Sequence, residues 1–173
     1  MLAFKFMQMT EENAATLAKW KYEEPYSIYN MDESNESILE LMNGEYFCVQ
    51  TPDNVIIGYI CIGDAARVPG GYENGIYSSD KNIDIGLGLK PELTNKGFGY
   101  NFLTSSIQFL KDQYDIHDFQ LVVAAFNERA IKVYERVGFV KGVHFKSRVD
   151  DSEIDFVVMN YSSCSDKSDS SKG

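Results

Sequence analysis

The chain has 173 residues, of which 44% are apolar, and this is enough for a single globular domain with a sizeable core. Its 26 acidic and 16 basic residues leave a net charge of −10, which argues against nucleic acid or an anionic membrane as a partner. The same surplus of acid weakly favours a cationic substrate such as an amine.

Strand-like and helix-like segments alternate along the whole chain. The elements predicted for the first half are a strand at 1–9, a helix at 11–20 capped by Thr10, a helix at 33–44, and two strands at 45–50 and 54–63 joined by a turn at 51–54. A long loop at 64–82 follows, of a length that is usually functional or mobile. The elements predicted for the second half are a strand at 83–90, a helix at 96–113, a buried strand at 119–126, a helix at 127–138, and a hairpin of strands at 139–149 and 153–161.

The order β-α-α-β-β-β-α-β-α-β-β predicts an α/β (α+β) fold with one central, twisted, mixed sheet. We expect six or seven mostly antiparallel strands, flanked by about four helices. The domain spans residues 1–161, and the serine-rich segment 162–173 reads as a disordered tail.

Cysteine and histidine are too few and too scattered to suggest a metal site. Cys48 and Cys61 lie in apolar, strand-like runs that are typical of inert core, and the two histidines are far apart in the sequence. The N-terminus lacks the pattern of a signal peptide, and no run approaches the ~20 apolar residues that a membrane span needs. We therefore expect a cytoplasmic protein in a reducing environment, either a monomer or a homodimer.

Gly97 and Gly99 stand at the start of the helix predicted at 96–113. The first amides of a helix have no partner within it and carry partial positive charge, so an anion can bind where no Cβ atom blocks it. Phe102 stands where the dinucleotide fingerprint requires a third glycine, and the Gly-Lys-Ser/Thr of a P-loop is missing. Taken alone, the pair fits an anion site and an ordinary turn equally well.

The segment 86–103 resembles the cofactor-binding motif of the GCN5-related N-acetyltransferase superfamily, Gln/Arg-x-x-Gly-x-Gly/Ala. Thr94 stands in place of the Gln or Arg, and Lys96 offers a positive charge beside it. A second stretch resembles the superfamily's next signature, an Asn after a strand, then a helix, then Tyr-Glu-x-x-Gly-Phe. It is carried by Asn127, Ala130, Tyr134, Gly138 and Phe139.

The two motifs occur in the superfamily's order and together cover residues 83–142. The resemblance implies acetyl-CoA as co-substrate and no metal. The residues implied to bind the cofactor are Leu87, Gly88, Leu89, Thr94, Asn95, Lys96, Gly97, Phe98, Gly99, Tyr100, Asn127, Ala130 and Tyr134. Residues 10–31 loosely resemble the branch that includes the ribosomal-protein alanine acetyltransferases, without fixing a substrate.

The resemblance further implies that the strands at 83–90 and 119–126 splay apart around the pantetheine arm. Backbone groups of Leu87 and Leu89 would bind the arm, and one amide would polarise the thioester carbonyl. Gly88 would leave room beside the arm, although Gly86 and Gly88 fit a strand bulge equally well.

Tyr134 is the residue that the second motif places near the thioester sulfur, where its hydroxyl would protonate or hydrogen-bond the leaving thiolate. From spacing alone, the ring fits equally a packing role beside Ile131. For the general base, Asp84 acting through water is the leading candidate, with a solvated strand-end carboxylate as the alternative.

Glu23 and Glu24, with Tyr26 and Tyr29, are predicted to line an acceptor pocket that attracts a cation. A solvated loop is the alternative for the two glutamates, and core packing is the alternative for the neighbouring Trp20.

The prediction is an acetyl-CoA-dependent N-acetyltransferase with direct transfer in a ternary complex, because no cysteine is expected where a covalent acetyl-enzyme would need one. The acceptor is a protein N-terminus, a lysine side chain or a small amine such as a polyamine. Two competing interpretations are a non-catalytic acyl-CoA-binding sensor or interaction domain, and a different nucleotide-binding α/β fold.

Overall fold

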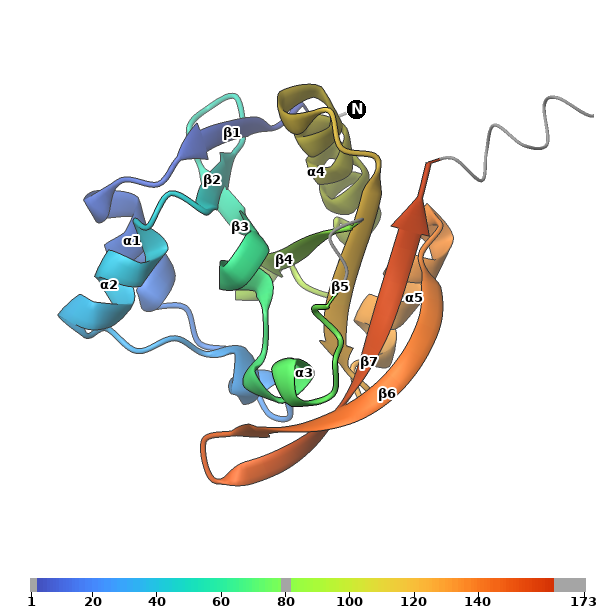
Figure 1. The fold of residues 1–173 in the computed structure, drawn as a ribbon. Helices are drawn as coiled ribbons and strands as arrows, with labels where there is room; N and C mark the ends of the chain where they lie inside the picture. The colour runs from blue at the N-terminus through green and yellow to red at the C-terminus, as the bar shows by residue number, and fades with distance from the viewer. Residues whose placement is uncertain (1–2, 79–81, 164–173) are drawn as a thin grey trace, which may run out of the picture.

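One seven-stranded sheet runs through the protein in the order β1-β2-β3-β4-β5-β7-β6 (Figure 1). The computed structural model describes residues 3–78 and 82–163. Its strands are β1 (Lys5–Gln8), β2 (Tyr46–Gln50), β3 (Ile56–Ile62), β4 (Ile83–Leu89), β5 (Asp118–Ala124), β6 (Val140–Val149) and β7 (Ser152–Ser162). Its α-helices are α1 (Glu11–Ala18), α2 (Asn35–Leu41), α3 (Pro69–Glu73), α4 (Gly99–Tyr114) and α5 (Glu128–Val137).

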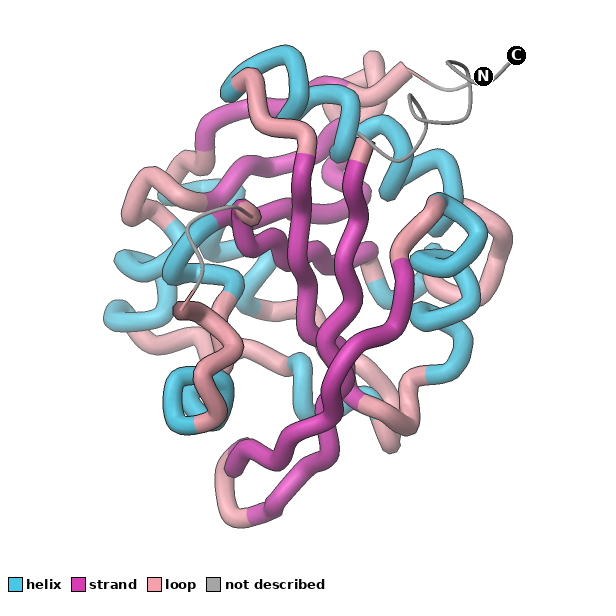
Figure 2. The backbone as a smooth tube through the Cα atoms, turned by 45° about the vertical axis from the view of Figure 1, so that its right-hand side comes forward, coloured by secondary structure: helices cyan, strands magenta, loops and turns pink. Residues whose placement is uncertain are grey.

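The described sheet is antiparallel at every junction except one, where β4 and β5 run parallel. This confirms the predicted fold class and the predicted order of strands and longer helices. Figure 2 shows the strands as one twisted layer with helices on both sides. The parallel junction matters most, because the chain must cross over through α4 to form it.

Three predicted helix boundaries are confirmed, two by capping hydrogen bonds and one by the backbone angle of a glycine. The Thr10 hydroxyl accepts from the Asn13 amide at 3.1 Å, and the Asn127 side chain accepts from the Ala130 amide at 3.3 Å. Both bonds satisfy first-turn amides that the helix itself leaves unpaired. Gly138 ends α5 with φ at +124°, a conformation that side chains disfavour.

Apolar side chains pack on both faces of the sheet. On one face, α4 and α5 cover a large cluster centred on residues such as Leu103, Ile107 and Phe119. On the other face, α1 and α2 pack over β2 and β3 around Leu17. At about 25 cal/mol per Å² of apolar surface removed from water, these clusters supply most of the stabilising free energy.

The helix after β4 begins later than predicted, at Gly99 rather than at residue 96. Asn95 and Gly97 adopt φ values of +60° and +84°, which a helix cannot contain, so the chain turns there before α4 starts. The loop predicted at 64–82 also differs, since it contains part of a 3-10 turn at Gly63–Ala66 and the short helix α3.

At the C-terminus, β7 extends to Ser162, one residue past the predicted end of the domain. The remainder of the predicted tail, residues 164–173, lies outside the described residues, as do residues 79–81 of the loop.

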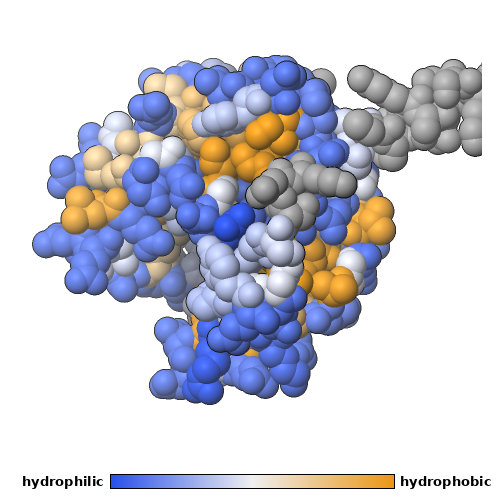
Figure 3. Space-filling model, viewed as in Figure 1, coloured by the Kyte–Doolittle hydropathy of each residue, from blue (hydrophilic) through white to orange (hydrophobic). Residues whose placement is uncertain are grey.

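Hydrophilic side chains cover most of the face in Figure 3, with apolar side chains gathered mainly toward its upper centre. Among the described residues, no helix has the length and apolar character to cross a bilayer. The same part of the chain contains no group of three or more histidine, cysteine or acidic side chains placed to hold a metal ion.

Candidate active site

The parallel strands β4 and β5 stay together over only two residue pairs. Ile83 pairs with Phe119 and Asp84 with Gln120, and beyond Asp84 the two strands part. On its other side, β4 continues to pair with β3 as far as Leu89. The second half of β4 therefore presents one unpaired backbone edge to the gap, as the predicted splay requires.

The register shows which peptide groups face this gap. The Lys90 amide donates to the Ile57 carbonyl at 2.8 Å, toward β3. Because peptide groups alternate in direction along a strand, those of Leu87 and Leu89 point the opposite way, into the gap. The Leu89 carbonyl already accepts a hydrogen bond from the Tyr22 hydroxyl at 2.7 Å, whereas Leu87 keeps both its amide and its carbonyl open.

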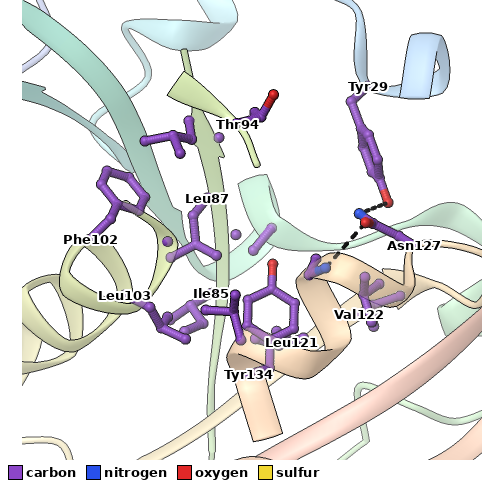
Figure 4. Close-up of a pocket in the computed structure, with 18 of the residues that line it drawn as sticks. Tyr29, Ile85, Leu87, Thr94, Phe102, Leu103, Leu121, Val122, Asn127 and Tyr134 are labelled. Carbon is purple, nitrogen blue, oxygen red and sulfur yellow. Dashed lines mark hydrogen bonds between the residues drawn. The ribbon is translucent and has the colours of Figure 1, made fainter. Parts of the chain in front are cut away.

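A cavity of about 490 Å³ occupies the gap, within the range of small-molecule sites (Figure 4). Most residues of the predicted site line it: Tyr26, Tyr29, Leu87, Gly88, Leu89, Thr94, Asn95, Gly97, Gly99, Tyr100, Asn127, Ala130 and Tyr134. The cavity thus joins the start of α4, the open edge of β4 and the start of α5.

Tyr134 extends from α5 into this cavity, with its hydroxyl directed toward the open space in Figure 4. Its ring packs against Phe139, with centroids 5.9 Å apart, and no described residue forms a hydrogen bond with the hydroxyl. Burial raises the pKa of Tyr134 above its usual value of 10. The hydroxyl is therefore a protonated donor that is free to bond to a ligand.

Asn127 links the start of α5 to Tyr29, another residue that lines the cavity and that is drawn at the upper right of Figure 4. Besides capping α5, its side-chain amide donates to the Tyr29 hydroxyl at 3.3 Å. The same hydroxyl accepts from the Ala124 amide at 3.3 Å, and burial raises the pKa of Tyr29. With its oxygen accepting twice, Tyr29 keeps its own proton available to donate into the cavity.

The structure requires glycine at the two motif positions, Gly97 and Gly99, for different reasons. Gly97 has φ at +84°, and a Cβ placed on it would meet nothing within 4 Å, so the backbone there is open to a ligand. A Cβ on Gly99 would lie 3.3 Å from a methyl group of Val133, so Gly99 lets α4 approach α5 closely. No side chain caps α4, which leaves its first amides free.

The positive charge beside these amides comes from α5 and not from the predicted Lys96. Lys96 is exposed and does not line the cavity, and neither does Phe98. Arg136 does line it, with its guanidinium 4.7 Å from the centre of the Tyr100 ring.

Arg129 is a second arginine of α5 that sequence reasoning missed, and it lies 3.8 Å above the Tyr26 ring. A signal was present in the sequence, because Arg129, Val133 and Arg136 follow the i, i+4, i+7 spacing of one helix face.

Asp84 does not occupy the position expected of a general base. It is 5% exposed, does not line the cavity, and uses both carboxylate oxygens in contacts with other side chains. Arg67 Nε donates to one oxygen at 2.7 Å, and Gln120 Nε2 donates to the other at 2.8 Å. Its contacts are those of a structural group that joins β4, β5 and the loop after β3.

The four residues predicted to line an acceptor pocket do not all reach the cavity. Tyr26 and Tyr29 line the cavity, but Glu23 and Glu24 are exposed and lie outside it. Trp20 packs against the α1–α2 cluster instead, which agrees with the core alternative.

Cys61 lies on the cavity wall, a position that the sequence did not indicate. It is 4% exposed, and burial raises the pKa of its thiol to about 12. Nucleophilic attack requires the thiolate, which is scarce at neutral pH in such a group. A cysteine is therefore present beside the gap in a protonated, unreactive form.

Comparison with known proteins agrees with this geometry. The model of the acetyltransferase (GNAT) family matches residues 12–139. No curated protein gives a significant match.

Three solved structures resemble the fold at low sequence identity. One, spermidine/spermine N-acetyltransferase SpeG from Vibrio cholerae in complex with manganese ions, is 19% identical, with a TM-score of 0.64 over 93% of this chain and 92% of that one. A GNAT-family acetyltransferase from Bacillus anthracis is 14% identical, with a TM-score of 0.66 over 94% and 96%. A putative phosphinothricin N-acetyltransferase is 13% identical, with a TM-score of 0.67 over 92% and 98%.

Proposed function

The chain belongs to the acetyltransferase (GNAT) family and is an N-acetyltransferase, and on that premise we propose that it moves the acetyl group of acetyl-CoA directly to a primary amine. The amine is a protein N-terminus, a lysine side chain or a small amine. The structural neighbours are described as acting on spermidine or phosphinothricin, and these are acceptors of the same broad kind.

One observation carries the proposal: a single cavity connects the free amides of α4 with the hydroxyl of Tyr134 through the gap between β4 and β5. Acetyl-CoA would supply a pyrophosphate and an activated thioester, joined by a long, narrow arm. The residues present fit such a molecule, because the open backbone at Gly97 and the guanidinium of Arg136 suit the anionic part.

The residues deeper in the gap suit the thioester. The Leu87 amide faces the cavity, where it would donate to the carbonyl oxygen as that oxygen gains negative charge. The Tyr134 hydroxyl would donate to the sulfur as the thiolate leaves. A free thiol has a pKa of about 8.5, well below the raised pKa of Tyr134, so hydrogen bonding stabilises the sulfur better than complete proton transfer does.

Direct transfer is favoured over a covalent enzyme intermediate by the state of Cys61. Its thiol lines the cavity but is protonated at neutral pH. The amine itself is then the nucleophile that attacks the thioester, and both substrates must be bound together.

The test is a calorimetric titration of the protein with acetyl-CoA, beside the variants Gly97→Glu and Gly44→Glu. Both glycines have positive φ and open space around them, so the two variants suffer similar backbone strain. We expect binding by wild type and Gly44→Glu and its loss in Gly97→Glu, where a carboxylate repels the pyrophosphate. A folded wild type that does not bind acetyl-CoA would refute the proposal.

A further inference from the structure

The charges around the cavity are the opposite of what a polycationic acceptor needs. Among the described residues, no aspartate or glutamate lines the cavity, whereas Arg67, Arg129 and Arg136 do. Asp84 and Asp64 bind Arg67, but Arg129 has no salt bridge with any described residue. A polyamine or a lysine side chain would therefore enter past uncompensated positive charge, which disfavours its binding.

The acceptor end can be located by exclusion. The start of α4 and Arg136 form the end suited to the anionic cofactor, so the acceptor must reach the thioester from the other side of the gap. That side is walled by Tyr46, Tyr59 and Cys61 on β2 and β3 and by Ala65 and Ala66 of the turn after β3. The centres of the Tyr46 and Tyr59 rings lie 6.0 Å apart. The carboxylate of Glu45 accepts from the Ala65 amide at 3.0 Å, but Glu45 does not line the cavity, so the surface of the wall is aromatic and uncharged.

This wall also lacks a group that could remove a proton from an ammonium ion. Burial raises the pKa values of Tyr46 and Tyr59 above 10 and that of Cys61 to about 12, so all three are protonated at neutral pH. The acceptor must therefore lose its proton to solvent before it attacks.

The cost of that step depends on the amine. An alkyl ammonium with a pKa near 10.4 is less than ~0.1% neutral at pH 7, whereas the α-ammonium of a peptide, with a pKa near 8, is roughly one-tenth neutral. The difference in reactive species is on the order of 100-fold.

From the arginines that line the cavity and the lack of a base in the tyrosine wall, and resting on the proposed function, we propose that the acceptor is the α-amine of a peptide and not a polyamine or a lysine side chain. This α-amine is the amino group on the carbon next to the first carbonyl group of a peptide, at its N-terminal residue. Its single weak positive charge is removed before reaction, and its carbonyl is compatible with the unpaired Arg129.

The step balances without any group beyond those named. The α-ammonium first releases one proton to water. The lone pair of the neutral nitrogen then forms the C–N bond as the C–S bond breaks. The electron pair of the C–S bond leaves with the sulfur, which accepts a hydrogen bond from Tyr134. Nitrogen loses a second proton to water and sulfur gains one, giving an N-acetyl product and free CoA.

The test measures kcat/KM at pH 7 for four acceptors: alanine, an alanine-initiated tripeptide amide, Nα-acetyl-lysine amide and spermidine. We expect the tripeptide amide to exceed both alkyl amines by on the order of 100-fold, because its neutral fraction is larger by that factor. Alanine against the tripeptide tells a free amino acid from a peptide terminus. Faster acetylation of spermidine or blocked lysine, or no acetylation of the tripeptide amide, would overturn the inference.

The pH dependence of the ratio of kcat/KM values provides a second test. A difference in how well two acceptors fit the cavity would not change with pH, whereas a difference in neutral fraction would. Between pH 8 and 9 the neutral fraction of an alkyl amine rises about tenfold, while that of a peptide α-amine less than doubles. The ratio of kcat/KM for the tripeptide to that for an alkyl amine should therefore fall by several-fold between pH 8 and pH 9. A preference that stays constant with pH would contradict the absence of a base.

The charge argument is tested with Arg129→Glu, with Arg129→Gln as its control. The ratio of kcat/KM for spermidine to that for the tripeptide should rise at least tenfold in Arg129→Glu and less in Arg129→Gln. An unchanged ratio would refute the role assigned to the charge. Acetyl-CoA titration of the same samples separates the two proposals: absence of binding counts against the proposed function, whereas binding with a preference for alkyl amines counts against the α-amine alone.

Discussion

Asp84 and Gln120 face each other at the last residue pair that joins β4 to β5, and the Gln120 amide donates to the Asp84 carboxylate at 2.8 Å. Arg67 holds the other carboxylate oxygen at 2.7 Å. The point where the sheet opens is thus fixed by three polar side chains around the buried Asp84, two from the strands and one from the loop after β3.

Replacing Asp84 with Asn should lower the free energy of unfolding by about 1 to 3 kcal/mol, because Arg67 loses its buried partner. Asp64→Asn is the matched control, since Asp64 contacts the same arginine at 3.0 Å but is 79% exposed. That variant should cost less than about 0.5 kcal/mol. Urea denaturation measures both, and a shifted acid limb in the pH profile of Asp84→Asn would instead support a catalytic base.

Tyr134→Phe should lower kcat by about 100-fold and leave the dissociation constant of acetyl-CoA nearly unchanged, because only the developing thiolate needs the hydroxyl. Tyr161→Phe is the control: its hydroxyl accepts from Lys111 at 3.0 Å, and Tyr161 does not line the cavity. Steady-state release of CoA measures the rates. Equal rates in Tyr134→Phe and wild type would remove the role assigned to the hydroxyl.

Arg136→Gln should weaken acetyl-CoA binding by about tenfold, whereas Lys96→Gln should change it by less than about twofold. The reason is position, because Arg136 lines the cavity beside Tyr100 and Lys96 does not. Added salt should narrow the difference between wild type and Arg136→Gln, since screening weakens an exposed charge. If Lys96→Gln weakened acetyl-CoA binding more than Arg136→Gln, Lys96 and not Arg136 would be the cation that binds the cofactor.

The buried tyrosines predict a limit to stability at alkaline pH. Burial raises the pKa values of Tyr22, Tyr59 and Tyr134 above the 10 of a free phenol. A group whose pKa is higher in the folded state stabilises the fold fully below its unfolded pKa, and this contribution is lost as the pH rises above it. Circular dichroism and phenolate absorbance should therefore change together above pH ~10. Phenolate that appears in an intact fold would show that these rings are hydrated.

The order of the elements along the chain and the caps at Thr10 and Asn127 could be predicted because each depends on local sequence. The helix start at Gly99 could not, because a glycine pair does not reveal which member has positive φ. The short helix α3 was missed because Gly70 and Gly71 are poor helix formers, and the Gly70 amide bonds to distant Ser147 at 2.8 Å.

The charged residues of the site were the least predictable part. Lys96 lies within the motif in sequence, but Arg136 reaches the cavity through the packing of α5 against α4, which no local pattern contains. The position of Asp84 near a strand end suggested a carboxylate that could act as a base. Its two oxygens accept hydrogen bonds from Arg67 and Gln120, which are distant in sequence, so the sequence alone did not reveal these contacts.

The close contact of Gly99 with Val133 joins the start of α4 and the helix of Tyr134 into one rigid pair. The packing of these two helices then sets the distance between the free amides of α4 and the Tyr134 hydroxyl, and with it the position of a bound cofactor. The tyrosine wall lies on β2 and β3, so its residues can change without altering that distance. The specificity for the acceptor and the position of the cofactor therefore depend on different elements. A redesign of the wall would change which amine is acetylated and would leave the binding of the acetyl donor unchanged.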